Sequence, residues 1–476
     1  MPRPKSSPSY CIHSRSGRAY TTIDGQQVQL GPANSPESRE AFDRVLGEWY
    51  ANGRKLPQNM SAAKDAPRTG PTVAIVLDRF WTHAETYYTR PVLDDAGQPR
   101  LTPDGSVQTE STEQLAHYRQ VIRLTRRLYG GLEATRFGCP ELEALREMMI
   151  RPRTDPATGA IEAPWCRKHA NRQVGRIKHI FGWAVTKGLV PVTVHQTLLL
   201  LPGLRIGKSA AKETAAVQPV DEAKALAVAK CASEQVGVMI QLQLLCGMRS
   251  TEVCIIRPCD IDRTVTPWQY TPMFHKTQEH DIARVIPIGP KAREILTPFL
   301  DRAATAFCFS PIEAEAKRRA LLHQKRVDGI DEKKTTPLSC GNRPGTNRKA
   351  KPKRSPGNRF DRRSYYNAVK HACEIAFKMP THYRSTPADY PVSGDSPAVV
   401  REKESRRRAK SAQRSKWHKE NAWHPHQARH RAATDLRKAG SLDVAKVVLG
   451  HTSIKMTALY AEADVAAAHE VIERIG

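Results

Sequence analysis

Four side chains that can act on a phosphodiester stand at fixed intervals near the C-terminal end of the sequence. His426 and Arg429 lie one turn apart in a helical pattern, His451 follows Arg429 by 22 positions, and Tyr460 follows nine positions later. A guanidinium can hold anionic oxygens, an imidazole can move protons, and a phenol can form a covalent bond to phosphorus. No carboxylate cluster or metal-ligand spacing accompanies them. The pattern therefore predicts covalent chemistry on DNA by a protein nucleophile.

The composition of the chain is compatible with such a substrate. The sequence has 476 residues and a formal net charge of +27, from 75 Lys and Arg against 48 Asp and Glu. A charge of this sign favours a polyanionic partner through counterion release, although a solvated basic surface or a ribosome-associated protein would have a similar balance. The length predicts two or three domains.

The cysteines and the hydropathy pattern indicate the compartment. Ten cysteines are scattered along the chain without a CxxC pair, which is typical of reduced thiols and not of a zinc site or a disulfide framework. No apolar stretch approaches the 18 residues of a membrane span, and the N-terminus lacks a signal-peptide pattern. We expect a cytoplasmic, nucleoid-associated protein without a membrane partner.

The first 60 residues predict a small module of one hairpin and one helix. The segments 19–23 and 27–30 flank Asp24-Gly25, a strong signal for a tight hairpin turn. Ser35 then begins a helix with capping chemistry. This module is either an arm-type DNA-binding element or a structural cap on the next domain, and the sequence leaves both open.

A helical region follows over residues 70–206. Helices are predicted over 72–88, 111–129, 140–149 and 163–188 from apolar residues at helical spacing. The last of these carries basic residues around its apolar stripe, and they are either a surface for phosphates or an ordinary solvated face. The candidate DNA-binding residues of this helix are Arg167, Lys168, Arg172, Arg176 and Lys178.

The remainder of the chain, residues 216–476, shows a third pattern. A helix beginning at Asp221 and an apolar helix over 236–246 precede strands at 268–273 and 283–288 and a helix over 290–300. Residues 313–420 form a basic insertion, with 28 Lys and Arg against 12 Asp and Glu. Within the insertion, 364–377 predicts an amphipathic helix, whereas 342–358 and 401–419 are either disordered or weakly helical.

Several short motifs of this third region occur in a characteristic order. The chain resembles the catalytic domain of the tyrosine recombinases, the phage integrase family of site-specific integrases. That family has an Arg followed by an acidic residue three positions later, a hairpin Lys, a His-x-x-Arg-His box, a Leu-Gly-His box, and a Tyr nine residues beyond. The matching residues here are Arg249 with Glu252, Lys276, His426 with Arg429 and His430, Leu449-Gly450-His451, and Tyr460.

The resemblance implies a fold class and a domain organisation. It implies a mainly α protein with a small antiparallel β-sheet (α+β), in which a helical, SAM-like core-binding domain at 70–206 and a catalytic domain at 216–476 form a C-shaped DNA clamp. Two features depart from the family pattern. Ala428 replaces a usual Leu beside Arg429, which could loosen that arginine, and the insertion at 313–420 lengthens the usual spacing.

The resemblance also implies a role for each motif residue. Tyr460 would attack the scissile phosphate and give a 3′-phosphotyrosyl link with a free 5′-hydroxyl. Arg249 and Arg429 would clamp the non-bridging oxygens, since a planar guanidinium forms bidentate contacts. Lys276 would protonate the leaving 5′-oxygen.

The remaining motif residues would assist this chemistry. His426 would act as general base or acid near the tyrosine, and His451 would donate a hydrogen bond to the phosphate. Glu252 and His430 would support the neighbouring catalytic residues. No cofactor or metal ion is expected, because the two arginines and Lys276 supply positive charge, and the covalent intermediate conserves the bond energy so that rejoining needs no ATP.

The leading interpretation is a site-specific DNA recombinase of a mobile element or prophage. The family implies a homotetramer on double-stranded DNA, with accessory DNA-bending or directionality factors as further partners. Two alternatives remain: a type IB topoisomerase-like relaxing enzyme that shares the chemistry, and a catalytically inactive DNA-binding regulator on the same scaffold.

Overall fold

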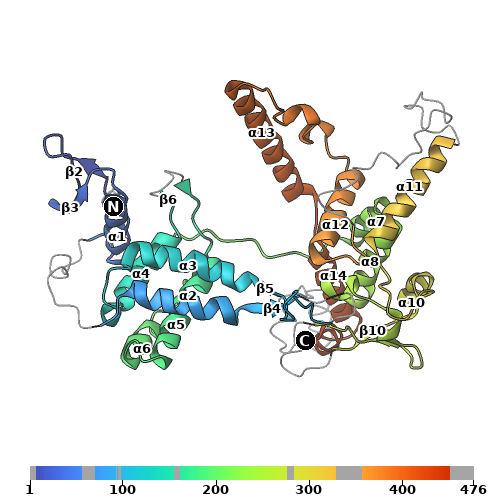
Figure 1. The fold of residues 1–476 in the computed structure, drawn as a ribbon. Helices are drawn as coiled ribbons and strands as arrows, with labels where there is room; N and C mark the ends of the chain where they lie inside the picture. Colours follow the sequence, from blue (N-terminus) through green and yellow to red (C-terminus); the bar gives the residue numbers. More distant parts are fainter. Residues whose placement is uncertain are drawn as a thin grey trace, which may run out of the picture. The chain divides into compact units, whose positions relative to one another are not determined.

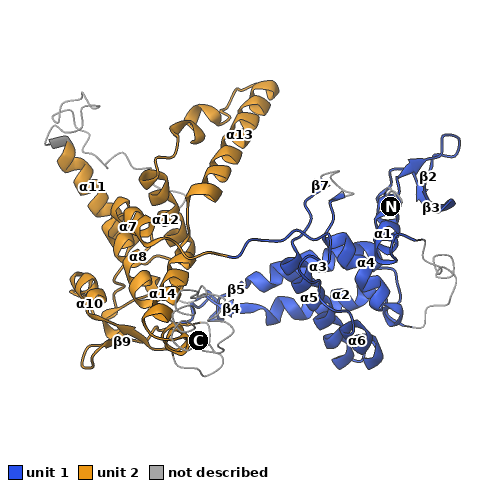
Figure 2. Ribbon diagram, turned by 180° about the vertical axis from the view of Figure 1, so that it is seen from behind, with its two compact units in different colours: residues 1–216 blue, residues 217–476 orange. Residues whose placement is uncertain are grey.

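The computed structural model describes residues 7–55, 70–92, 94, 98–154, 161–275, 284–327 and 356–450. The chain divides into two compact units, residues 1–216 and 217–476 (Figure 2). Helices dominate both units, and the sheets are small and antiparallel, so the predicted mainly α fold class with small antiparallel sheets is confirmed. Among the described residues no helix is both long enough and apolar enough to span a membrane.

The N-terminal hairpin forms as predicted. Strands β2 (Arg18–Ile23) and β3 (Gln26–Pro32) pair antiparallel, and the short β1 (Cys11–Ile12) pairs with β2. Asp24 and Gly25 both have positive φ, 48° and 82°, as a tight two-residue hairpin turn requires. Helix α1 (Pro36–Ala51) begins at the Ser35 cap and packs its buried Val45 and Trp49 against the sheet.

The rest of unit 1 is a helical bundle around one apolar core. Its helices are α2 (Val73–Tyr87), α3 (Glu113–Tyr129), α4 (Cys139–Met149), α5 (Arg167–Thr186) and α6 (Val192–Leu199). The four predicted helices are confirmed, because their apolar stripes meet in the core, with Phe80, Phe137 and Phe181 fully buried. Two small hairpins join them, β4 (Thr89–Pro91) with β5 (Thr109–Ser111) and β6 (Arg153–Thr154) with β7 (Ile161–Glu162).

Unit 2 is built around helix α8 (Glu234–Cys246), most of which is buried. The helices α7 (Glu222–Cys231), α10 (Pro290–Leu296), α12 (Arg362–Ala376) and α14 (Pro425–Ala439) pack against it or its neighbours, and the short α9 (Ser250–Cys254) follows it. A three-stranded antiparallel sheet has the order β10 (Ile286–Ile288), β9 (Trp268–Tyr270), β8 (Ile261–Asp262). Helices α11 (Pro311–Val327) and α15 (Leu442–Leu449) also belong to this unit, and Figure 1 labels α11.

The basic insertion contains one long helix. Residues 397–421 form α13 (Pro397–Asn421), so the helical alternative for 401–419 holds and the disordered one is wrong. None of the 25 residues is buried, and Figure 1 shows the helix extending away from the packed helices α12 and α14. The predicted helix at 364–377 corresponds to α12. Most of the segment 342–358 lies outside the described residues.

Candidate active site

The first predicted box lies at the end of α8, and its glutamate is buried. Gly247 ends α8 in the left-handed conformation, and Arg249 is the N-cap of α9. Glu252, three residues on, accepts a hydrogen bond from the backbone N–H of Arg249 at 2.7 Å and from its Nη1 at 2.6 Å. The Arg-x-x-Glu spacing therefore has a local reason, because the third helical residue can reach back to the cap.

Arg429 joins three separate segments of unit 2. It lies on α14 and is 1 % exposed. Its Nη1 donates to the carbonyl oxygen of Gly247 and its Nη2 to that of Leu449, both at 2.6 Å, and its Nη1 lies 3.9 Å from the Glu252 carboxylate. Beside the small Ala428, Arg429 is thus held on two sides by carbonyl oxygens.

A third arginine, Arg284, completes the cluster and was not singled out in the sequence. Its Nε and Nη2 lie 3.3 and 3.5 Å from the two carboxylate oxygens of Glu252, and its Nη1 donates to the carbonyl oxygen of Val448 at 2.7 Å. A signal was present, since Arg284, Ile286 and Ile288 alternate along the chain and all three are buried. A buried arginine next to a strand needs charged or hydrogen-bonding partners.

The four side chains form an electrostatic unit with an excess of positive charge. Burial by itself would raise the pKa of Glu252, but Arg284, Arg249 and Arg429 outweigh it and lower that pKa below its ordinary value. Glu252 is therefore ionised at neutral pH. One carboxylate faces three guanidinium groups, so the cluster retains a positive charge that can meet an anion. We call Glu252, Arg249, Arg284 and Arg429 the Glu252 cluster.

Two glycines let the segments around this cluster approach one another. Gly247 and Gly450 have φ of +62° and +63°, in the left-handed region that favours glycine. A Cβ on Gly247 would lie 2.7 Å from a side-chain carbon of Leu449, and one on Gly450 would lie 2.8 Å from Nη1 of Arg284. Glycine is therefore favoured at both positions, because a side chain would clash with its neighbours and because the backbone is left-handed.

The histidines of the third box lie on the first turns of α14. The rings of His426 and His430 meet edge to face at 5.1 Å, and His424 lies parallel to His426 at 6.5 Å. Burial and the neighbouring His430 and Arg429 lower the pKa of His426 to about 4. The imidazole is therefore neutral at pH 7.

The other three predicted catalytic residues, Lys276, His451 and Tyr460, lie outside the described residues. Their neighbours in sequence are placed beside the Glu252 cluster. Gly450 accepts a hydrogen bond from Nη2 of Arg249 at 3.4 Å. The pKa of His275 is lowered by burial and by Arg249 and Arg284, while Glu252 opposes the shift. No group of three or more potential metal-ligating side chains occurs within the described parts of the chain.

The five basic residues proposed on α5 divide into two groups. Arg167 pairs with Glu213 at 2.6 Å, Arg176 donates to Gln114 at 2.8 Å, and Lys178 donates to the Leu201 carbonyl at 2.7 Å. These three side chains therefore have partners within unit 1. Lys168 and Arg172 are exposed.

Comparison with known proteins gives one family match and several structural likenesses. The phage integrase family model matches residues 399–466, which include α14, α15 and four of the predicted catalytic residues. No curated protein matches the chain.

Among solved structures, a Tn1549 transposon integrase in complex with a circular intermediate DNA is 14 % identical, with a TM-score of 0.45 over 86 % of this chain and 100 % of that one. A lambda integrase dimer bound to a COC′ core site has 14 % identity, a TM-score of 0.43, and coverage of 82 % and 95 %. A lambda integrase tetramer bound to a Holliday junction has 15 % identity, a TM-score of 0.39, and coverage of 97 % and 96 %.

The family match covers residues 399–466, so this part of the chain is similar to the phage integrase family.

Proposed function

We propose that this protein is a site-specific DNA recombinase that breaks and rejoins double-stranded DNA through a 3′-phosphotyrosyl intermediate. The observation that carries the proposal is the Glu252 cluster. Within it, Arg249 and Arg429, 180 positions apart in the sequence, share one buried carboxylate. The cluster is positively charged and borders Gly450, directly before His451 in the Leu-Gly-His box.

In this mechanism Arg249 and Arg429 bind the non-bridging oxygens of the scissile phosphate. The bonds from Arg429 to the carbonyl oxygens of Gly247 and Leu449 fix its guanidinium group in position. Arg249 is the more accessible of the two, with 19 % of its side chain exposed. Because these donors are fixed before the substrate arrives, they stabilise the charge that develops in the transition state at little reorganisation cost.

His426 acts as the general base in the cleavage step. Its lowered pKa keeps the ring neutral at physiological pH, so it can take the phenolic proton from Tyr460 as the oxygen attacks phosphorus. The 5′-oxygen of the broken P–O bond leaves with a proton from Lys276, and His451 donates a hydrogen bond to the phosphate. Rejoining reverses these steps, with the 5′-hydroxyl attacking the phosphotyrosine and the phenol as leaving group.

We further infer a homotetramer on two duplexes, and a mobile element or prophage as the source of the chain. Strand exchange requires two cleaved duplexes within one assembly, and the net charge of +27 suits a protein that binds a long stretch of DNA backbone. In this arrangement the N-terminal module, residues 1–60, contacts arm sequences, and Lys168 and Arg172 contribute phosphate contacts.

The test uses DNA from the boundaries of the genetic element that encodes the protein. The purified chain is incubated with this DNA and quenched in SDS, and protein–DNA adducts that protease treatment removes are measured, with Tyr460→Phe alongside. We expect an adduct with the unmodified protein and none with Tyr460→Phe, because phenylalanine has no nucleophilic oxygen. Tyr366→Phe is a matched control, since this tyrosine is exposed on α12 and should leave the adduct intact.

Other outcomes separate the remaining functions. Retarded DNA without any adduct in either protein would overturn the enzyme assignment and favour a DNA-binding regulator. Relaxation of a supercoiled plasmid that lacks any element-derived sequence would favour a topoisomerase-like activity instead.

A further inference from the structure

The insertion between α12 and α14 is held in place by charge and not by an apolar core. None of the residues of α13 is buried, and the helix carries nine Lys and Arg against three Glu. Such a helix has no apolar face of its own with which to pack. What fixes it is a set of carboxylates on the neighbouring segments.

Glu374 on α12 is the most important of these carboxylates. Its side chain is 1 % exposed and accepts hydrogen bonds from Nε of Arg414 at 2.8 Å and from Nε2 of His418 at 2.8 Å, with Nη2 of Arg384 at 3.3 Å. Burial would raise the pKa of Glu374, but Arg414 and His418 lower it below the ordinary value, so the carboxylate is ionised. We call these four residues the Glu374 cluster.

Two aspartates extend the same attachment toward the N-terminal part of the helix. Lys410 donates to the buried Asp389 at 2.7 Å, and Lys403 donates to Asp395 at 2.8 Å. Lys403, Lys410, Arg414 and His418 follow one another at intervals of seven, four and four, so they lie on one face of α13. The basic side chains on that face are therefore already paired with carboxylates of the neighbouring segments.

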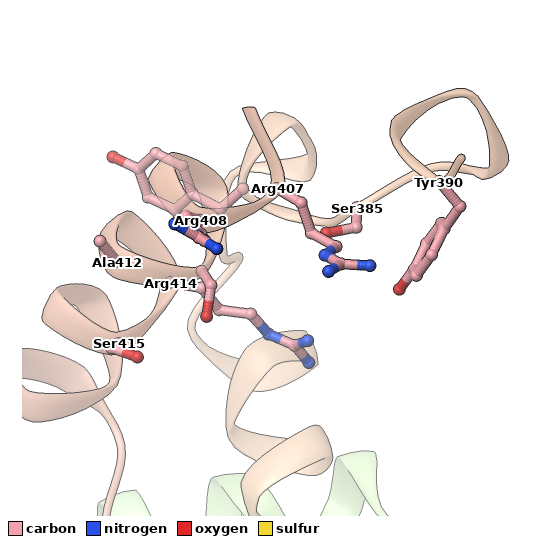
Figure 3. A pocket seen from close by; sticks show the side chains of 9 residues that line it. Ser385, Tyr390, Arg407, Arg408, Ala412, Arg414 and Ser415 are labelled. Carbon is pink, nitrogen blue, oxygen red and sulfur yellow. The ribbon is translucent and has the colours of Figure 1, made fainter. Parts of the chain in front are cut away.

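A pocket lies beside the attached face, and its lining is suited to an anion. It has a volume of about 570 Å³ and is formed by α13 and the segment 383–390. Three arginines, three serines, two tyrosines and one alanine line it, and none of the described lining residues is acidic. In Figure 3 the guanidinium group of Arg407 lies between α13 and the segment that carries Ser385 and Tyr390.

The three arginines of this pocket differ in whether a carboxylate already pairs with them. Arg414 is committed to Glu374. Arg407 stacks on the ring of Tyr390 at 5.3 Å, and among the described residues it has no carboxylate partner. Arg408 reaches Glu404 at 3.5 Å, but its side chain is 81 % exposed, so that pair is weak. Arg407 and Arg408 thus offer two guanidinium forks beside the hydroxyls of Ser411 and Ser415.

We propose that Arg407 and Arg408, with the serine hydroxyls beside them, bind a backbone phosphate of duplex DNA outside the crossover site. Guanidinium and hydroxyl donors are the common partners of DNA phosphates, and an exposed pocket on a protruding helix can reach a backbone without contacting bases. The proposal rests on the proposed function, because it takes DNA as the partner, and it assigns the basic insertion a part in that binding.

The position of the pocket along α13 sets the distance between the proposed phosphate contact and α14. The C-terminal end of α13 leads through Trp423, which is buried, to α14, which carries His426 and Arg429. Arg408 stands 13 residues before Asn421, a distance of about 20 Å at the 1.5 Å rise of an α-helix. The phosphate contact is therefore separated from the active-site helix by a fixed span of helix, and it adds affinity without entering the chemistry.

The experiment measures equilibrium binding of the full chain to a 30-base-pair duplex of arbitrary sequence over a range of salt concentrations. Arg407→Ala/Arg408→Ala is compared with Arg401→Ala/Arg406→Ala. The control pair removes the same charge from exposed positions of the same helix, and in each pair one arginine faces a glutamate four residues earlier. Circular dichroism of both variants confirms that α13 remains helical.

We expect the pocket pair to weaken binding about ten-fold and to reduce the slope of log K against log salt by about 1 to 2, as loss of one or two phosphate contacts requires. The control pair should change both quantities much less. Equal losses in the two variants would overturn the pocket in favour of a diffuse basic surface. Unchanged binding by the pocket pair would also overturn it.

Further measurements distinguish DNA from other phosphate-bearing ligands. They also distinguish failure of the phosphate contact from failure of the chemistry at Tyr460. If the pocket pair lost binding only to duplex RNA, or only to inorganic phosphate in a calorimetric titration, DNA would be excluded as the occupant. Because this assay needs no cleavage, an expected result here with no adduct at Tyr460 would overturn the recombinase and keep the phosphate contact. The reverse pattern would overturn the phosphate contact alone.

Discussion

Two buried glutamates in unit 2, Glu252 and Glu374, each contact several basic side chains, yet the two clusters have different surroundings. In the Glu252 cluster the side chains of Arg284 and Arg429 are 2 % and 1 % exposed, like the carboxylate between them. In the Glu374 cluster the carboxylate is equally buried, but Arg384 and Arg414 are each 43 % exposed. The first cluster belongs to the interior and the second fixes an interior residue to a surface helix.

This difference in exposure indicates which ion pairs can be removed without unfolding unit 2. Charges that are buried together cannot recover water when a partner is removed, so the loss is large. Charges at the surface recover water and are also screened by salt. For Glu252 the lowered pKa means that its stabilisation is present above the ordinary carboxyl value of 4.5 and is lost as the pH falls below that range.

The largest effect should come from Glu252→Gln. The change removes the central charge and leaves three arginines facing one another in a buried site, so we expect unit 2 to lose about 3 to 5 kcal/mol of stability. Adduct formation at Tyr460 should fall by at least about 100-fold, because Arg249 and Arg429 lose their common partner. Thermal unfolding and the SDS-quenched adduct assay measure the two effects.

Glu294→Gln provides a matched control for that variant, because Glu294 lies on the surface of α10. It should behave like the unmodified protein in both assays. A Glu252→Gln protein with unchanged stability and full adduct yield would show that the comparison between the two clusters is wrong.

An intermediate effect is expected for Arg284→Lys. Lysine keeps the charge but cannot reach Glu252 and the Val448 carbonyl together as the planar guanidinium does. We expect adduct formation to fall about ten-fold while DNA affinity changes little, because Arg284 positions the Leu-Gly-His segment without itself binding the phosphate. The adduct rate at saturating DNA is the measurement, and Arg293→Lys on α10 is the control. A loss of affinity with an unchanged rate would instead identify Arg284 as a DNA ligand.

The smallest effect on stability should follow Glu374→Gln, about 1 kcal/mol or less, since its arginine partners are partly solvated. The local effect should be clear, because α13 loses its main attachment. Limited trypsin digestion should cut within α13 several times faster in this variant, while the Tyr460 adduct keeps its rate. If the cleavage pattern were unchanged, Asp389 and Asp395 would be sufficient to hold the helix.

Local features were the parts of the fold that the sequence predicted well. The Asp24-Gly25 turn, the cap at Ser35 and the helices of unit 1 depend on neighbouring residues and on simple periodicity, so their signals are contained in short windows. The Arg249–Glu252 pair is also local, because three-residue spacing at a helix start brings the groups together.

The features that depend on distant partners could not be predicted in the same way. Nothing near Arg284 in the sequence indicates that it meets Glu252, which is 32 positions earlier. Residues 401–419 are too charged for their order to be predicted from composition, and the carboxylate that binds Arg414 of this helix, Glu374, lies on another helix. Charge pairs across long separations have no period, so composition alone describes them as solvated.

The two ends of the segment between α12 and α14 meet at one place in unit 2. Sγ of Cys373, near the end of α12, lies 3.9 Å from the carbonyl oxygen of Trp423, just before α14, although 50 positions separate them. A segment that departs from and returns to one point of a packed domain can be lengthened, shortened or exchanged with little disturbance to the domain. We therefore expect that residues 378–421 can be deleted or replaced by protein engineering without displacing α14.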